Sequence, residues 1–125
     1  MKTPLLLLAL LLLPGCFIAR ETTNEPLLRE RIEGLQVGKT TASEAAEALG
    51  APSEVVELGD RSAWRYEYVV SKTAGFTLIV VTFVNDDRRT DRCWLFFDAK
   101  DVLTHVGTTL DAADARYAMP WQDVP

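Results

Sequence analysis

Two side chains in this sequence could act together as a nucleophile and its general base. The chain of 125 residues holds two cysteines and one histidine, and the pair in question is Cys93 and His105. Such catalysis also needs a group that orients the base and donors that stabilise an oxyanion, and no motif supplies either. Cys93 opens the apolar run Cys93–Phe97, which is typical of a strand interior. We therefore expect no enzyme, with Cys93 a small buried hydrophobe and His105 on the rim or surface of a sheet.

Acidic clusters could hold a cation. Their members are Glu54, Glu57 and Asp60 in one cluster and Asp86, Asp87 and Asp91 in the other. Neither follows the spacing of a calcium-binding loop, and both fall in segments that we expect to be loops. One histidine and two cysteines cannot complete a four-ligand zinc site without carboxylates. We expect solvated acidic surface here, with no metal and no cofactor.

The other cysteine follows a pattern with a covalent chemistry of its own. Lys2 precedes the apolar run Leu5–Leu13, which is shorter than the roughly 20 residues of a membrane span and is typical of a secretory signal peptide. The segment Leu12–Cys16 resembles a bacterial lipobox, in which the cysteine thiol accepts a diacylglyceryl group and cleavage leaves that cysteine first. We expect residues 1–15 to be a lipoprotein signal peptide and Cys16 to be the lipid attachment site. An ordinary cleaved signal or an uncleaved anchor is the alternative.

Acylation of Cys16 would hold the protein on a membrane. Acyl chains such as palmitate contribute about 0.8 kcal/mol per buried methylene, so several chains anchor a small domain firmly. Residues 16–26 are mostly polar and are expected to be a lipid-anchored tether. Phe17, where an aspartate is absent, favours the outer membrane, with the domain on its periplasmic side. Cys93 then has no partner for a disulfide within the chain, and a formal charge of −5 argues against nucleic acid as a partner.

The remaining chain divides into helical and extended patterns. Thr41–Glu44 matches a capping box, and Gly50 suits the end of the helix that it begins. Leu28, Ile32 and Leu35 share one face of a shorter helix before it. Extended segments are expected at 64–70, 76–84, 93–97 and 102–108, with a turn at 73–75 and a charged connection at 85–92.

This order of elements indicates the fold class. Short helices followed by consecutive strands are typical of an α+β domain with an antiparallel sheet. We predict two short N-terminal helices packed on one face of a three- to four-stranded antiparallel sheet. The domain would occupy residues 27–110, and residues 111–125 would form a C-terminal tail.

The predicted sheet carries more apolar surface than two short helices can cover. The segments 76–84 and 93–97 are apolar on both faces, and the helices would shield one face only. Large apolar patches seldom stay bare. The other face is covered by the tail through Tyr117, Met119 and Trp121, by a second copy of the chain, or by a protein partner. The candidates for a partner surface are Ile79, Val81, Phe83, Trp94 and Phe96.

Several of these motifs occur together in one family. Leu35–Thr40 and Leu49–Pro52 resemble the Leu-x-x-Gly-x-Thr and Leu-Gly-x-Pro motifs in the helical half of the SmpA/OmlA (BamE-like) family. The second half of that family has an aromatic strand, here Trp64–Tyr68, and a hairpin closing on Phe-Asp-x-x-x-Val, here Phe97–Val102. The resemblance covers residues 32–107. It implies a small outer-membrane lipoprotein that faces the periplasm and works by surface contact without catalysis.

Two hypotheses of function follow from the resemblance. The best-known member of the family is an accessory subunit of the machinery that inserts β-barrel proteins into the outer membrane. The leading hypothesis is therefore a lipid-anchored, non-catalytic interaction module that serves barrel assembly or envelope integrity, with no small-molecule substrate. The unit of two helices and a sheet is also similar to half of the β-lactamase inhibitor protein. The alternative is a periplasmic inhibitor or ligand-binding lipoprotein unrelated to barrel assembly.

Overall fold

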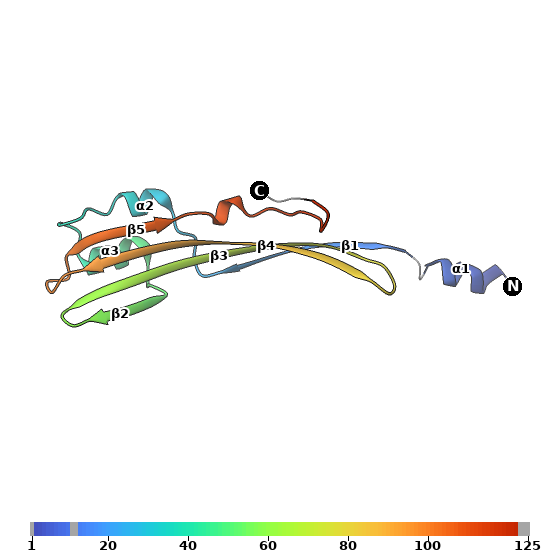
Figure 1. The fold of residues 1–125 in the computed structure, drawn as a ribbon, viewed down its shortest axis with the longest axis horizontal. Helices are drawn as coiled ribbons and strands as arrows, with labels where there is room; N and C mark the ends of the chain where they lie inside the picture. Colours follow the sequence, from blue (N-terminus) through green and yellow to red (C-terminus); the bar gives the residue numbers. More distant parts are fainter. Residues whose placement is uncertain (1, 11–12, 123–125) are drawn as a thin grey trace.

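A single antiparallel sheet organises the computed structural model of the chain, which describes residues 2–10 and 13–122 (Figure 1). Its elements in chain order are α1 (Lys2–Leu10), β1 (Gly15–Thr23), α2 (Arg29–Glu33), α3 (Ala42–Leu49), β2 (Glu54–Leu58), β3 (Arg61–Thr77), β4 (Thr82–Phe97), β5 (Leu103–Thr109) and the 3₁₀ turn η1 (Ala112–Asp114). The strand order is β1-β3-β4-β5, and β2 pairs with the part of β3 that β1 leaves free. Within the described residues, no helix is long and apolar enough to cross a bilayer.

The β3–β4 hairpin is the longest feature of the sheet. Its strands have 17 and 16 residues and pair without a break from Ser62 opposite Phe97 to Thr77 opposite Thr82. Side chains alternate between the two faces of a sheet, so this one register assigns every residue of both strands to a face. We call the face that carries Tyr66 and Leu95 the core face, and the other the open face.

The predicted fold class is wrong. The sheet has five strands, and it rather than a helical layer makes up most of the structure. The segment 16–26, which the sequence predicted to be a tether, contributes β1. The predicted turn at 73–75 lies inside β3, and the predicted connection at 85–92 lies inside β4.

The predicted turn at 73–75 and the predicted connection at 85–92 were wrong for physical reasons. A Cβ atom at Gly75 would lie 2.2 Å from the ring of Phe17, so this glycine lets β1 pack against β3 and does not mark a turn. The charged residues of β4 serve the C-terminal segment, because Asp91 accepts a hydrogen bond from the amide of Ala112 at 2.6 Å. Asp87 accepts one from the amide of Arg116 at 2.9 Å. These two carboxylates therefore hold the C-terminal segment against the charged part of β4.

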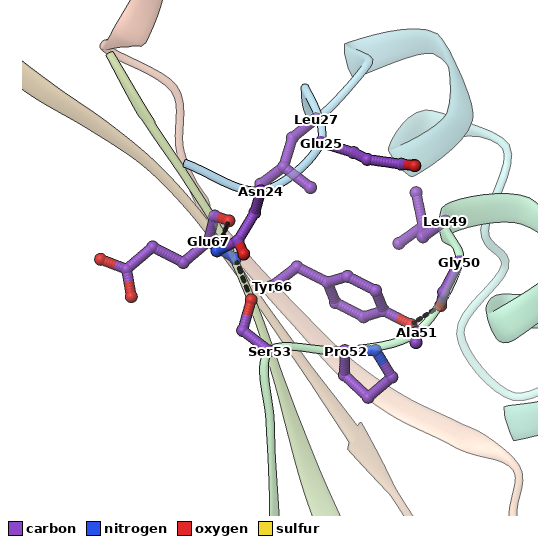
Figure 2. A pocket seen from close by; sticks show the side chains of 10 residues that line it. All are labelled: Asn24, Glu25, Leu27, Leu49, Gly50, Ala51, Pro52, Ser53, Tyr66 and Glu67. Atoms are coloured by element: carbon purple, nitrogen blue, oxygen red, sulfur yellow. Dashed lines mark hydrogen bonds between the residues drawn. The ribbon is translucent and has the colours of Figure 1, made fainter. Parts of the chain in front are cut away.

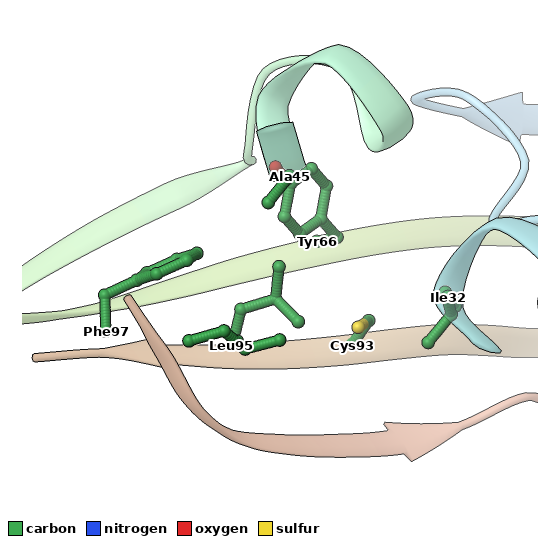
Figure 3. Packing of buried hydrophobic residues seen from close by; sticks show 7 residues of the cluster. Ile32, Ala45, Tyr66, Cys93, Leu95 and Phe97 are labelled. Atoms are coloured by element: carbon green, nitrogen blue, oxygen red, sulfur yellow. The ribbon is translucent and has the colours of Figure 1, made fainter. Parts of the chain in front are cut away.

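The main core lies between the core face and the two helices α2 and α3. Ile32 of α2 and Ala45 of α3 are directed toward the sheet (Figure 3). The buried cluster comprises Ile32, Ala45, Tyr66, Cys93, Leu95, Phe97 and Leu103. The hydroxyl of Tyr66 donates a hydrogen bond to the carbonyl oxygen of Gly50 at 2.9 Å, which ties the end of α3 to the sheet.

The C-terminal segment covers the core face beyond the helices. After η1 it continues along the β3–β4 hairpin toward the tip (Figure 1), with Ala112 and Ala115 packed on Tyr68 and Val70. Tyr117 and Trp121 stay 44% and 67% exposed. The segment therefore lies on the same face as the helices and leaves the open face of the sheet uncovered.

Helix α3 begins as its sequence predicts. The side chain of Thr41 accepts a hydrogen bond from the amide of Glu44 at 3.3 Å, and the Glu44 carboxylate accepts one from the amide of Thr41 at 2.9 Å. This reciprocal pair confirms the capping box. Gly50 ends the helix with φ of 81°, a value that favours glycine.

Replacement of the helix cap gives a direct test of this local structure. Thr41→Ala removes the side-chain acceptor at the start of α3, and we expect the free energy of unfolding to fall by about 1 kcal/mol. Ser43→Ala is the matched control, because Ser43 is exposed in the first turn and is not the cap residue. Urea unfolding followed by circular dichroism measures both, and equal stabilities of the two variants would contradict the assignment.

Candidate functional site

An apolar groove occupies the open face at the end of the sheet that carries the helices on its other side. It has a volume of about 510 Å³. The side chains and backbone that line it come from four strands: Val56 and Leu58, Ala63, Trp94 and Phe96, and Gly107. Trp94 and Phe96 face away from the core because they alternate with the buried residues of β4, and the register places Val56, Ala63 and Gly107 on the same face.

Aromatic rings form the floor of the groove. Trp94 and Phe96 lie with ring centroids 6.3 Å apart and planes inclined by 20°. His105 meets Phe96 edge-on at 6.3 Å. Gly107 stands opposite Trp94 on β5, where a Cβ atom would meet nothing within 4 Å. The missing side chain at Gly107 thus keeps the indole uncovered.

A charged cluster borders the groove on the side toward the hairpin tip. The guanidinium of Arg65 lies 5.9 Å from the Trp94 ring and pairs with Glu54 at 2.9 Å. Glu67 accepts contacts from both Arg65 at 3.8 Å and Arg92 at 3.5 Å. The Nε atom of Arg65 is buried and has no hydrogen-bond partner in the described part of the chain. The groove therefore combines an apolar floor with one unused donor at its edge.

A second pocket, of about 340 Å³, lies beside Tyr66, where the segments before α2 and after α3 meet β3 (Figure 2). The amide of Asn24 donates a hydrogen bond to the carbonyl of Glu67 at 2.8 Å, and the amide of Glu67 donates one to Ser53 at 3.2 Å. The carboxylate of Glu67 points away from the cavity. The polar groups around this pocket hold the segment before α2 and the segment after α3 against β3.

The sheet separates the two residues that could have formed a catalytic pair. Cys93 is 0% exposed on the core face, whereas His105 is exposed and in register with Phe96 on the open face. Burial raises the pKa of the Cys93 thiol to about 11, which keeps it protonated and weakly nucleophilic at neutral pH. The geometry gives no support to a cysteine nucleophile with a histidine base.

The five partner-surface candidates fall at two ends of the sheet. Trp94 and Phe96 lie together in the groove. Ile79, Val81 and Phe83 are exposed at the hairpin tip, at the opposite end of the same strands. The uninterrupted register also puts Phe83 on the core face and Trp94 on the open face, so the structure does not bring the five together.

Sequence analysis missed the contribution of β2 to the groove. Val56 and Leu58 lie on the open face, in register with Ala63 and Arg61. The signal was the β-branched pair Val55–Val56 with Leu58, followed by a Gly-Asp turn, which is typical of a short hairpin strand. Two of the residues grouped there as an acidic cluster belong to this strand, and Glu54 pairs with Arg65.

No protein-family model, curated protein or solved structure matches this chain in the three comparisons made. The likeness to the SmpA/OmlA family therefore rests on the motifs in the sequence alone.

The buried thiol and phenol predict a fall in stability at alkaline pH. Burial raises the pKa of Cys93 from 9.0 to about 11, and burial with the nearby Cys93 raises that of Tyr66 from 10.0 to about 12. Their stabilising effect is complete below the unfolded pKa values and is lost as the pH rises through the folded ones, because the unfolded chain releases its protons first. For Cys93 alone the loss amounts to about 3 kcal/mol between about pH 9 and pH 11. Urea unfolding across this range measures it.

Cys93→Ala is the test of the assignment. The variant has a cavity and starts from a lower stability at neutral pH, but its stability should fall less steeply than that of the parent protein above about pH 9. Parallel pH profiles for the two proteins would show that Cys93 ionises as easily in the folded chain as in the unfolded one.

Proposed function

We propose that this protein is a lipid-anchored, non-catalytic interaction module on the periplasmic side of the outer membrane. The observation that carries the proposal is the lipobox-like segment Leu12–Cys16, whose cysteine is exposed in a strand of the sheet. The SmpA/OmlA-like motifs support a role as an accessory factor in β-barrel protein assembly or envelope integrity.

The position of Cys16 supports direct anchoring of the folded domain. Cys16 is the second residue of β1 and lies in register with Phe76 of β3. Because β1 pairs with β3 from Cys16 to Thr23, little slack chain separates the attachment point from the sheet. An acyl anchor at Cys16 would therefore hold the domain at a short and restricted distance from the membrane.

The groove supports binding of a protein. Its apolar floor is open to solvent, and a partner that inserts apolar side chains over Trp94 and Phe96 would remove both rings from water. Anchoring raises the local concentration of the groove near other envelope proteins, which strengthens a weak contact.

The first test addresses the anchor. We expect the expressed protein to incorporate radiolabelled palmitate and to fractionate with the outer membrane. Cys16→Ala should lose the label completely, because no other thiol stands in the lipobox-like segment. Cys93→Ala, which removes the buried thiol, is the control and should keep the label. Labelling that survives Cys16→Ala would refute this attachment site.

The second test addresses the groove. Gly107→Glu places a charged side chain over Trp94 in open space, so folding should be unaffected while partner binding falls at least tenfold. Thr109→Glu is the matched control, since it lies on the same face of β5 opposite Arg92, outside the groove lining. The measurement is a mild-detergent pull-down of tagged protein with quantitative mass spectrometry.

The identity of the captured protein decides between the two candidate roles. Barrel-assembly components that are captured by the parent protein and by Thr109→Glu, and lost with Gly107→Glu, would support the accessory role. A soluble periplasmic protein with the same pattern would favour an inhibitor or ligand-binding lipoprotein instead. Equal capture by all three proteins would refute the groove as the binding surface.

A further inference from the structure

The tip of the β3–β4 hairpin carries exposed apolar side chains on both faces. Residues 74–85 contain no acidic or basic side chain, and neither do residues 15–19 of the adjoining β1. Val80 is 89% exposed. The exposed apolar side chains at this end are Phe17, Ile18, Leu78, Ile79, Val80, Val81, Phe83 and Val84. Exposed apolar patches of this kind mark surfaces that contact a protein or a membrane.

The residues of the turn are apolar, although the turn is exposed to solvent. Leu78 and Val81 exchange two backbone hydrogen bonds, at 2.7 and 3.3 Å, so Ile79 and Val80 form a two-residue loop. Such loops ordinarily use Asn, Asp or Gly, which accept the backbone geometry and are well hydrated. Two β-branched aliphatic residues at the point of a hairpin offer no advantage to the turn itself. Their common property is a preference for a non-aqueous surrounding.

The proposed lipid attachment site adjoins this apolar end. Cys16 is in register with Phe76, and Phe76 is in register with Phe83, so the three side chains form one row on the core face. On the open face the next row joins Phe17, Gly75 and Val84. A diacylglyceryl group bonded to the sulfur of Cys16 would thus start beside two phenyl rings of the hairpin.

Charged and amphipathic residues mark where the apolar end stops. Arg20 of β1, Lys72 of β3 and Asp87 of β4 lie in one row across the sheet. The ammonium group of Lys72 lies 5.4 Å from the ring of Tyr117. Lysine and tyrosine together are typical of the boundary between hydrocarbon and water, where each keeps an apolar body and a polar end.

We infer that the hairpin tip inserts into the hydrocarbon of the same membrane leaflet that holds the acyl chains of Cys16. The inference rests on the lipid anchor proposed above. From the pair Ala74–Asn85, three further pairs and the turn span about 15 Å at 3.3 Å per residue, which matches one leaflet of a core about 30 Å thick.

A bilayer fits this end of the molecule better than a protein does. The patch surrounds the tip on both faces, whereas a protein interface would be expected on one. The backbone of the turn is closed by its own hydrogen bonds, which reduces the cost of entering hydrocarbon.

A fluorescent label at the tip tests the inference. Val80→Cys, in the full lipidated chain, is labelled with an environment-sensitive dye, while Cys93 is buried and does not compete. Asp60→Cys, at the exposed turn between β2 and β3 at the far end of the hairpin, is the matched control. Both proteins are reconstituted into vesicles of phosphatidylethanolamine and phosphatidylglycerol, with or without nitroxide-labelled acyl chains. Circular dichroism checks that each variant keeps the sheet.

The dye at position 80 should shift its emission to shorter wavelength and gain intensity several-fold in vesicles. Nitroxides on the acyl chains should quench it several-fold more strongly than the dye at position 60. Equal, water-like emission at both positions overturns the inference. So does a shift at position 80 that lipid nitroxides do not quench and that grows with protein concentration, because a second copy of the chain would then cover the tip.

The anchor and the insertion fail separately in this design. Palmitate labelling at Cys16 with a water-exposed dye at position 80 leaves the anchor standing and removes the insertion. A quenched dye at position 80 without palmitate labelling removes the anchor and leaves the hairpin as the membrane contact.

Discussion

The uninterrupted pairing of β3 with β4 is the constraint on which the rest of the molecule depends. Its 16 residue pairs run from Ser62 and Phe97 to Thr77 and Thr82 without a bulge. With a side-chain period of two, a slip of one residue would exchange the faces along the whole length. Cys93 and Leu95 would then face solvent, and Trp94 would enter the helix-covered core. The core and the groove are two consequences of one register.

The local elements of the fold could be predicted where short-range chemistry decides them. The capping box at Thr41 and the positive φ of Gly50 are properties of adjacent backbone atoms, and both are visible in the sequence. The lengths of β3 and β4 could not be predicted in this way. Gly75 looked like a turn because its real reason, the ring of Phe17 lying across it, comes from a strand more than fifty residues away in the sequence. Asp87 and Asp91 looked like a connection because their partners lie in the C-terminal segment.

The candidate site shows the same division. An aromatic surplus in the 93–97 segment made Trp94 and Phe96 partner-surface candidates, because apolar residues at both parities of one strand cannot all face one core, and both side chains line the groove. The grouping of Phe83 with them could not be judged before the register was known. Gly107 has no side chain, so the hydropathy pattern of the sequence could not indicate its role. Its position opposite Trp94 nevertheless leaves the groove open.

The hairpin also sets the geometry between membrane and partner. From the charged row at Lys72 to the groove residue Ala63, β3 runs nine residues, or about 30 Å at 3.3 Å per residue. If the tip and the acyl chains of Cys16 fix one end in the leaflet, the stiffness of the paired strands fixes the groove at that height above the surface. An anchor on a flexible tether would let the distance between the groove and the membrane vary widely. An anchor on a paired strand would keep that distance nearly constant. In that arrangement the apolar residues at the two ends of β4 would act together, because membrane contact at Phe83 would position the surface around Trp94 for a partner of matching height.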